Sequence, residues 1–407
     1  MPEYDGKVLQ VFLHQRLIGT LTHLAGDKNL FAFTEEYIRD SARPTLSLSF
    51  QDSLGELRTA IKVARTRLPC FFSNLLPEGA FQEYLAKKAN INPKHEFLLL
   101  WMLGKDLPGA IVLQSMEEDI PLTSSSTEFA DTHEKKKIPF RFSLAGMQVK
   151  FSAMKEFGKL TIPVKGVGGS WIVKLPSPVF PHLPENEFSM MELARRTGID
   201  VPEIALHSIQ DLRGLPPEFA HIGNHFYAIK RFDRTEDGGR IHMEDFAQVF
   251  GIYPEGKYDK VSYRNMAERI WKENGEAGIA EFVRRFVFNA LIGNGDMHLK
   301  NWSFLYREKN KPSLSPAYDF VSTICYLPQD GLAMNFVDDK AFSSLTLAQF
   351  KRFAGKAQLP EALVLDTVQQ TVEAFAEAWK NVNDLPLRKE TRDVIERHLK
   401  TMPLWYR

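Results

Sequence analysis

Residue types that phosphoryl transfer requires stand close together in residues 289–301, which read NALIGNGDMHLKN. Asp296 and Asn301 are five residues apart, and another carboxylate, Asp319, follows Asn301 by 18 residues. A carboxylate beside an acceptor hydroxyl can take its proton, while an amide and a second carboxylate can hold Mg²⁺ on nucleotide phosphates. The spacing therefore predicts Asp296 as a base and Asn301 and Asp319 as magnesium ligands.

The interval from Asp296 to Asn301 also separates the base from the metal-binding Asn in the catalytic loop of protein kinases. A predicted strand at residues 302–306 places Asp319 where the metal-holding Asp of such an enzyme would fall. The ordinary alternatives are a polar surface turn for the first segment and a helix N-cap for Asp319. A surface turn accounts less well for a polar run that continues as far as Asn301.

Two lysines lie on predicted strands upstream of this segment. Residues 143–150, SLAGMQVK, form a glycine turn whose N–H groups, with Lys150, could contact phosphate oxygens. One glycine makes a poor phosphate loop, so an ordinary hairpin turn is the better interpretation in isolation. Lys174 lies in the apolar strand WIVKLP, and Glu187, thirteen residues later in a predicted helix, is its candidate ion-pair partner. The alternative for Lys174 is a solvent-facing lysine on a half-exposed strand.

Lys230, Arg231 and Phe232 follow the predicted strand FYAI at the place where the hinge between two kinase lobes would lie. The backbone of such a hinge would bond the adenine, although a charged strand end is an equally good interpretation. A glycine turn, a strand lysine, a helix glutamate, a hinge, Asp-x-x-x-x-Asn and a final Asp thus follow one another in kinase order. Six features in this order are much less expected by chance than any one of them.

Composition limits the classes to which the chain can belong. The chain has 407 residues, of which 44% are apolar and 25% charged, with a formal net charge of +0. These values predict a soluble globular protein of two or three packed units, without a strong nucleic-acid surface of its own. Cys70 and Cys325 provide neither a disulfide framework nor a zinc cluster. No signal peptide or membrane-spanning stretch is recognisable, so we expect a cytoplasmic location and no membrane contact.

Patterning along the chain predicts an α+β architecture. Its parts are a small N-terminal α/β subdomain of residues 1–115, a polar linker or exposed hairpin of residues 116–138, a β-rich part of residues 139–235 and a helical part of residues 236–407. The β-rich part includes a predicted amphipathic helix at residues 186–197, for which Gly198 is the natural stop. The last part is helical from His242 onward, with helices predicted at residues 244–250, 263–274, 278–292, 345–357, 360–381 and 387–402. Because the last part also carries Asp296, the two larger parts predict a bilobal, protein-kinase-like fold with a β-rich N-lobe and a helical C-lobe. Within the first part, period-two alternation predicts a half-buried strand at residues 44–50.

The chain resembles the HipA-type serine/threonine kinases of bacterial type II toxin–antitoxin modules over nearly its whole length. The resemblance includes FFSNLLPEGAFQEYLA and LLLWMLGKDLPGAIVL near the N-terminus, which catalysis does not require. It continues through FSLAGMQVKFS, WIVKLP, ENEFSMMELARRTGIDVP, KRFDR, GNGDMHLKN and SPAYDFVS. These ordered matches imply a serine/threonine-protein kinase that uses ATP and Mg²⁺.

Matching positions carry the roles that the resemblance implies. Asp296 would be the catalytic base, and Asn301 and Asp319 would hold Mg²⁺. Ser143 falls at the family's autophosphorylation serine, whose phosphorylation pulls the phosphate loop out and switches the kinase off. About two negative charges beside an ATP phosphate site are repulsive, which agrees with such a switch. The expected ATP contacts are Ala145, Gly146, Met147, Gln148, Val149, Lys150 and Lys174 at the phosphates, Lys230, Arg231 and Phe232 at the hinge, and His298, Asn301, Tyr318 and Asp319 around the nucleotide and metal.

The resemblance also implies partners. Family targets are aminoacyl-tRNA synthetases, typically glutamyl-tRNA synthetase, whose phosphorylation stalls tRNA charging and halts growth. The usual partner is a small, HipB-like helix-turn-helix antitoxin that binds operator DNA, so DNA would be held mainly through the antitoxin. Two positions depart from the family pattern, namely Lys230, where an acidic residue is common, and Met297, where a small or acidic residue is frequent. The catalytic positions are intact, so we expect an active enzyme.

Two other functions are open on the sequence. GNGDMHLKN also resembles the HGDLHxxN loop of aminoglycoside and choline kinases, so a small-molecule phosphotransferase would use the same metal chemistry. The NLLPEG segment argues against that class. A non-catalytic corepressor that acts only through a bound antitoxin is the second alternative. Phosphate on Ser143 after incubation with ATP would favour a protein kinase, and growth arrest that needs Asp296 would exclude a corepressor.

Overall fold

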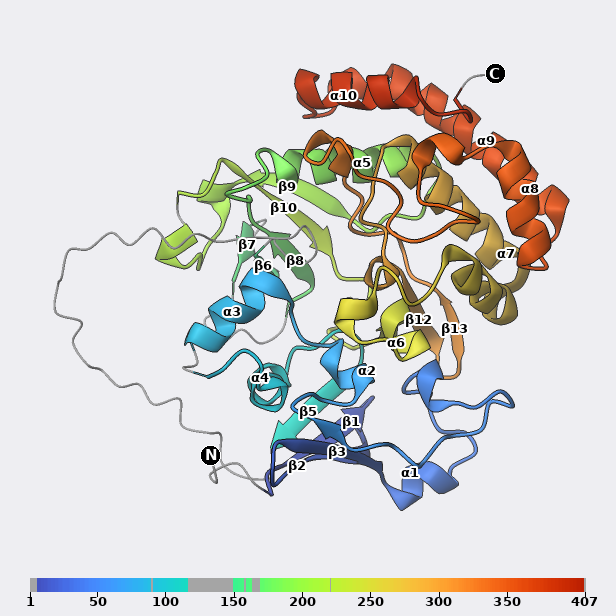
Figure 1. The fold of residues 1–407 in the computed structure, drawn as a ribbon. Helices are drawn as coiled ribbons and strands as arrows, with labels where there is room; N and C mark the ends of the chain where they lie inside the picture. The colour runs from blue at the N-terminus through green and yellow to red at the C-terminus, as the bar shows by residue number, and fades with distance from the viewer. Residues whose placement is uncertain are drawn as a thin grey trace.

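The structure, a computed structural model, describes residues 6–88, 91–115, 149–156, 159–162, 169–219 and 221–405. The segment expected as a linker or exposed hairpin, residues 116–138, lies outside these ranges, as does the first of the two strands predicted around the glycine turn. Within the described ranges the chain forms three antiparallel sheets and a set of helices that becomes denser toward the C-terminus (Figure 1). This mixture is the predicted α+β architecture.

The N-terminal unit, defined as the described residues between 6 and 115, contains one sheet and four helices. Its elements are β1 (Val8–Leu13), β2 (Arg16–Leu24), β3 (Lys28–Phe33), α1 (Glu35–Arg39), β4 (Ala64–Arg65), α2 (Cys70–Ser73), α3 (Gly79–Lys88), α4 (Glu96–Leu103) and β5 (Ile111–Ser115). The strands pair in the order β4-β3-β2-β1-β5. Alternate residues of β1, such as Leu9 and Val11, are buried because successive side chains of a strand point to opposite faces. They share one apolar core with Phe72 and Leu100 of the helices.

The strand predicted at residues 44–50 is wrong. This segment is irregular until a single 3₁₀ turn, η1 (Leu48–Phe50), and most of its residues are buried rather than alternately exposed. The Ser47 hydroxyl and the Leu48 N–H both donate to the carboxylate of Glu244, at 2.5 and 3.0 Å. The apolar residues are thus explained by burial between two parts of the chain, and not by pairing in a sheet.

A second sheet, called here the central sheet, follows the N-terminal unit in the chain and precedes the helical part. Its order is β7-β6-β8-β10-β9, with β6 (Lys150–Glu156), β7 (Lys159–Thr161), β8 (Trp171–Lys174), β9 (Ile204–Ser208) and β10 (His225–Lys230). The predicted amphipathic helix is α5 (Leu183–Arg196), which packs on β9 and β10 (Figure 1). It ends, as expected, just before Gly198, whose φ of +84° favours glycine.

Strand pairing in the central sheet places three polar side chains in one row. Lys150 of β6 lies opposite Lys174 of β8, and Lys174 lies opposite Tyr227 of β10. Directly opposed residues of antiparallel strands project to the same face. The two lysines that the sequence singled out therefore share a face, next to the start of the helical part.

The prediction of helix from His242 onward is wrong for its first four residues, which form β11 (His242–Asp245). This strand pairs with β12 (Ser303–Glu308), and β12 pairs with β13 (Lys311–Leu314). His242 and Glu244 point into the protein, so the buried face of β11 is polar and gives no apolar signal of a strand. Asp245 then caps α6 (Phe246–Phe250).

The helical part is built around α7 (Tyr263–Leu291), which is broken at Gly275 (φ +56°). This break divides it into the two helices that the sequence predicts. The three C-terminal helices are also as expected, namely α8 (Leu347–Lys356), α9 (Glu361–Lys380) and α10 (Lys389–Leu399). Helix α9 packs along α7 and α5, and α10 lies at the top of the molecule as drawn in Figure 1. Within the described part of the chain, no helix combines the length and apolar character that crossing a bilayer needs.

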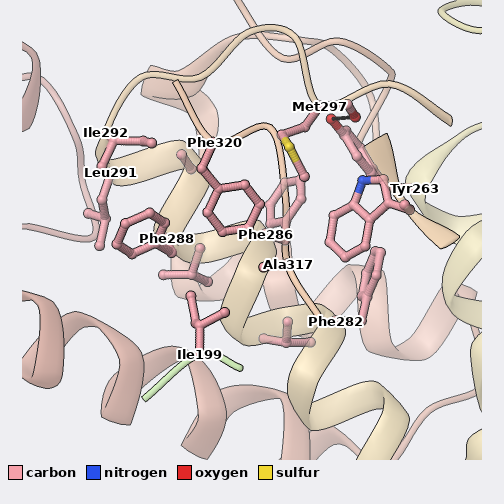
Figure 2. Close-up of a cluster of buried hydrophobic side chains, with 14 of the residues drawn as sticks. Ile199, Tyr263, Phe282, Phe286, Phe288, Leu291, Ile292, Met297, Ala317 and Phe320 are labelled. Atoms are coloured by element: carbon pink, nitrogen blue, oxygen red, sulfur yellow. Dashed lines mark hydrogen bonds between the residues drawn. The ribbon is translucent and has the colours of Figure 1, made fainter. Parts of the chain in front are cut away.

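The aromatic core around α7 supports the segment on which the chemistry was predicted. Figure 2 shows Phe282, Phe286 and Phe288 of α7 packed in one cluster with Met297 and Phe320. The hydroxyl of Tyr263, at the start of α7, donates to the Met297 carbonyl oxygen at 2.9 Å. Met297 follows Asp296 and Phe320 follows Asp319. Packing of these two side chains in the core therefore fixes the backbone next to each predicted site carboxylate.

Candidate active site

The loop of residues 293–301 leaves α7 through a turn that requires glycine. Gly293 has φ +65°, and a Cβ there would lie 2.3 Å from the Ile324 side chain. A Cβ on Gly295 would lie 2.1 Å from a carboxylate oxygen of Asp330. These close approaches explain both glycines of GNGD structurally, so the turn positions the loop and need not bind a ligand itself.

Asp296 lies in a mostly buried position at the centre of this loop, with a side chain that is 22% exposed. Its Oδ1 accepts a hydrogen bond from the Tyr258 hydroxyl at 2.6 Å, and its N–H donates to the Asn294 side chain at 3.0 Å. Burial raises the pKa of the Asp296 carboxyl to about 6, although the Tyr258 hydrogen bond and the positive charge of Lys257 oppose this. A carboxyl with a pKa close to neutral suits a general base.

Asn301 and Asp319 provide oxygen donors near Asp296. The Asn301 Nδ2 donates to the Asp296 carbonyl oxygen at 2.7 Å, which leaves Oδ1 on the other arm of the planar amide. Asp319 has φ +58°, which is unusual for a residue other than glycine, and its side chain is 31% exposed. An amide and a carboxylate oxygen are the hard donors that Mg²⁺ prefers, so the donor chemistry fits this metal. Among the described residues, no group of three His, Cys, Asp or Glu side chains suits a metal ion.

Lys174 joins the central sheet to this site. Its Nζ lies 2.5 Å from Oε1 of Glu187 in α5, which is the ion pair predicted from the sequence. The same ammonium contacts the carboxylate of Asp319. Glu187 is almost completely buried, and a buried carboxylate needs such a partner to stay ionised. The strand lysine, the helix glutamate and the carboxylate after residue 301 therefore meet in space.

The predicted phosphate contacts are described only in part. Lys150 is exposed at the start of β6, beside Lys174, and the Val149 carbonyl oxygen accepts the N–H of Leu175 at 2.9 Å. The other predicted contacts of this loop lie outside the described residues, as does the predicted regulatory serine; they are Ala145, Gly146, Met147, Gln148 and Ser143. Lys150 and Lys174 supply positive charge on one face.

The backbone of the predicted hinge, Lys230 to Phe232, is hydrogen-bonded to other segments of the protein. The Lys230 N–H donates to the Glu203 carbonyl oxygen and the Arg231 N–H to that of Ser170, both at 2.8 Å. These two N–H groups therefore serve the fold. The Phe232 ring lies 5.6 Å from that of Tyr318.

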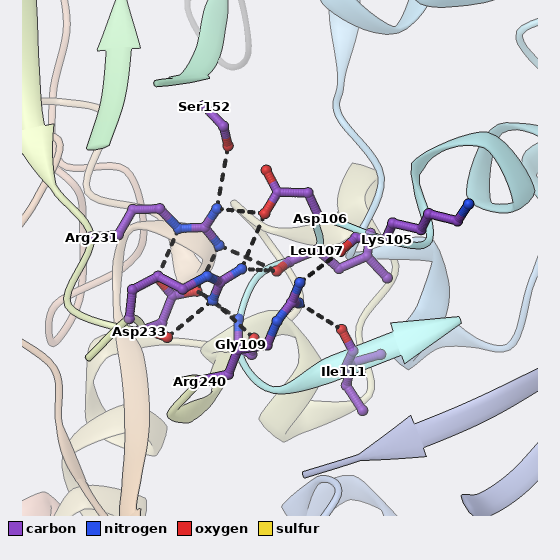
Figure 3. A network of polar contacts seen from close by, with 10 residues as sticks. Lys105, Asp106, Leu107, Gly109, Ile111, Ser152, Arg231, Asp233 and Arg240 are labelled. Carbon is purple, nitrogen blue, oxygen red and sulfur yellow. Dashed lines mark hydrogen bonds and ion pairs between the residues drawn. The ribbon is translucent and has the colours of Figure 1, made fainter. Parts of the chain in front are cut away.

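The Arg231 side chain is part of a buried network that joins this hinge to the N-terminal unit (Figure 3). Arg231 and Arg234 both pair with Asp106, at 2.9 and 3.2 Å, and with Asp233, at 2.9 and 2.8 Å. All four side chains are 5–8% exposed. The Arg231 side chain therefore has a structural role at this interface, while the sequence assigned adenine contact to the hinge backbone.

His298 and Tyr318 both lie at the site but face protein groups. His298 Nε2 is 3.9 Å from Asp296 Oδ1, and its ring meets that of Tyr258 edge-on at 4.9 Å. Burial lowers the pKa of His298 well below its usual value, so the imidazole is neutral, and within the described residues its buried Nδ1 has no hydrogen-bond partner. The Tyr318 hydroxyl donates to the Lys300 carbonyl oxygen at 3.0 Å and so braces the end of the loop.

Three residues at the site were not predicted as functional, namely Tyr258, Lys257 and Glu78. Tyr258 donates a hydrogen bond to Asp296, the predicted base, while Lys257 and Glu78 form an ion pair at 2.6 Å close to it. Glu78 belongs to the NLLPEG segment, which catalysis does not require. The presence of this segment was the signal in the sequence that could have indicated Glu78. Tyr258 and Lys257 lie in a short irregular segment whose packing against the loop no local pattern reveals.

Comparison with known proteins gives a consistent result along the chain. Residues 9–114 match the HipA N-terminal domain, and residues 142–379 match the HipA-like C-terminal domain. The chain is 47% identical over 403 residues to a putative kinase, Y4dM, of Sinorhizobium fredii, with 98% of each chain covered. It is 25% identical over 408 residues to the serine/threonine-protein kinase toxin HipA of Shewanella oneidensis, covering 92% of this chain and 89% of the relative.

A solved structure shares the fold. The Shewanella oneidensis toxin–antitoxin complex of HipA, HipB and operator DNA contains a chain that superposes with a TM-score of 0.74 at 23% identity, covering 98% of this chain and 96% of the other. At this identity the likeness concerns the fold, and it agrees with the predicted kinase-like arrangement of the sheets and helices.

Proposed function

This chain belongs to the HipA family of kinases, and from that premise we propose that it is an ATP- and Mg²⁺-dependent serine/threonine-protein kinase whose catalytic base is Asp296. The observation that supports this most directly is the meeting of Lys174 with Glu187 and Asp319. A lysine held between a helix glutamate and a metal-binding aspartate is the arrangement that kinases use to orient the phosphates of ATP.

In this proposal each residue has a separate task. MgATP, when bound, supplies the phosphoryl group and the metal's positive charge. Asn301 and Asp319 offer oxygen ligands, and Lys174 with Lys150 neutralises phosphate oxygens. Asp296 accepts the proton of the substrate hydroxyl on Oδ2, because Oδ1 is bonded to Tyr258. The buried, neutral His298 excludes water beside the base.

Purified protein tests the proposal. Incubation with MgATP should place phosphate on the chain itself, with Ser143 as the expected site, and the matched variant Asp296→Asn should incorporate none. Ser143→Ala should lose most of the signal, and a full signal in this variant would place the regulatory serine elsewhere, for instance at Ser152. Transfer of phosphate to small alcohols such as aminoglycosides or choline, with no transfer to protein, would instead identify a small-molecule phosphotransferase.

We further propose a role as the toxin of a toxin–antitoxin pair, since a relative carries that name. The proposed target is an aminoacyl-tRNA synthetase such as glutamyl-tRNA synthetase, and the proposed partner is a HipB-like helix-turn-helix antitoxin that holds DNA. Phosphoproteomics of expressing cells would reveal the target and its site together. Growth arrest that persists unchanged in Asp296→Asn would favour a non-catalytic corepressor.

A further inference from the structure

One carboxylate of the N-terminal unit reaches the 293–301 loop. Glu78 lies immediately before α3, and its two oxygens bind different lysines. Oε2 lies 2.6 Å from Nζ of Lys257, and Oε1 lies 2.8 Å from Nζ of Lys300. The three side chains are 24%, 6% and 14% exposed, so this is a shielded cluster and not a solvated surface pair.

Both lysines adjoin residues that hold the site together. Lys257 precedes Tyr258, whose hydroxyl bonds Asp296. Lys300 precedes Asn301, whose amide bonds the Asp296 backbone. Glu78 is thus connected to the proposed base by two short routes, one on each side of it.

Of the two remaining contacts of Lys300, one leads to the N-terminal unit and the other to Asp245 of the helical part. Its Nζ donates to the carbonyl oxygen of Asn74 at 3.0 Å and lies 3.9 Å from Oδ2 of Asp245. The Asn74 amide in turn donates to the Ile252 carbonyl oxygen at 2.8 Å. The end of α2 and the start of α3 therefore form a surface on which the loop rests.

The charges agree with a tight cluster. Burial alone would raise the pKa of Glu78, but the ammonium groups of Lys300 and Lys257 outweigh it and lower that pKa to about 2. The other ionisable groups that face these residues are Asp330, Tyr258, His298, Asp245 and Lys150.

We propose that Glu78 is a positioning residue through which the N-terminal unit holds the 293–301 loop in place. The inference rests on the proposed kinase function. It assigns a role to the N-terminal unit, whose segments the phosphoryl-transfer chemistry itself does not require. Without the carboxylate, Lys257 and Lys300 repel each other in a shielded space, and Tyr258 and Asn301 move with them. A displacement of about 1 Å at a catalytic group can cost on the order of 100-fold in rate.

Glu78→Gln tests this inference, with Glu83→Gln as the matched control. Glu83 is an exposed residue of α3, the helix that Glu78 immediately precedes. Its variant therefore removes one negative charge from α3 away from the cluster. Hydrogen–deuterium exchange of a peptide spanning residues 293–301 measures how firmly the loop is held, whether or not the protein is a kinase. We expect faster exchange in Glu78→Gln than in the parent, and parental exchange in Glu83→Gln.

Kinetics provide a readout that a merely structural role would not change. We expect kcat of Glu78→Gln to fall about 10- to 100-fold, because the catalytic loop is displaced, while KM for ATP changes much less. Glu78→Asp keeps the negative charge between the two lysines, so it should recover part of the lost kcat. Parental exchange of the loop in a folded Glu78→Gln protein would overturn the inference. An inactive parent would instead contradict the proposed function, and the exchange data would still decide the role of Glu78.

Discussion

Lys174 Nζ in β8 lies 2.5 Å from Glu187 Oε1 in α5, and the same ammonium contacts Asp319 beyond the 293–301 loop. Lys174→Met should therefore weaken ATP binding about tenfold or more, because a charge-assisted hydrogen bond contributes roughly 1.5–3 kcal/mol. Lys155→Met is the matched control, since Lys155 lies in the same sheet but is half-exposed and pairs with Glu203. Binding of a fluorescent ATP analogue measures both variants, and equal losses in the two would show that Lys174 has no specific role.

Asp296→Asn should abolish phosphoryl transfer and yet make the fold more stable. The folded pKa of the Asp296 carboxyl is about 6, above its ordinary value of 3.8, so the ionised group destabilises the fold at neutral pH. That penalty applies in full above pH 6 and disappears below about pH 4. Replacing the carboxylate by a neutral amide should add about 1–3 kcal/mol to the free energy of unfolding at pH 7.5.

Urea unfolding at two pH values checks this prediction. The gain of Asp296→Asn over the parent should be largest at pH 7.5 and should shrink at pH 4.5. A variant that is less stable than the parent at neutral pH would mean that the carboxylate is stabilising and that its raised pKa is wrong.

The pH dependence of kcat/KM should report the same carboxyl. Below about pH 6 Asp296 becomes protonated and can no longer accept a proton, so the rate should fall toward acid. Tyr258→Phe removes a hydrogen bond that lowers this pKa, so its acid limb should move to higher pH. An acid limb that stays in place in Tyr258→Phe would show that another group is titrating.

The sequence predicts the elements of this site better than their connections. Lys174 and Glu187 pair as expected because an apolar strand and an amphipathic helix give clear local signals. Asp319, which also contacts Lys174, lies in an irregular segment after β13. Residues 44–50 and β11 were misassigned because both are buried in contacts between units, where Glu244 bonds Ser47 and Leu48. Such pairings join residues far apart in the chain, and local periodicity contains no record of them.

The hinge shows the same limit at the level of a single residue. Arg231 is next to Phe232 in sequence, but its guanidinium is committed to Asp106 and Asp233. Only the folded structure reveals that this charge belongs to an interface between the N-terminal unit and the central sheet (Figure 3).

Asp106→Asn should be strongly destabilising, because it removes one of the two buried carboxylates that pair with both Arg231 and Arg234 and leaves Asp233 to balance two guanidinium groups. Breaking a buried pair in this way typically costs about 3–5 kcal/mol. The matched control is Asp338→Asn, which breaks an exposed pair with Arg352 and should change stability far less, because exposed ion pairs are screened by solvent. Denaturant unfolding followed by tryptophan fluorescence measures both, and similar small losses in the two variants would contradict the interface role.

If this chain is the proposed kinase, Asp296 must be needed to move phosphate from ATP to a protein hydroxyl. The decisive measurement is the initial rate of ³²P incorporation into protein from γ-labelled MgATP, for the parent and for folded Asp296→Asn. We predict time-dependent labelling on serine in the parent and no labelling above background in the variant. Equal labelling in both proteins would contradict the assignment of the base, and with it the proposed kinase mechanism.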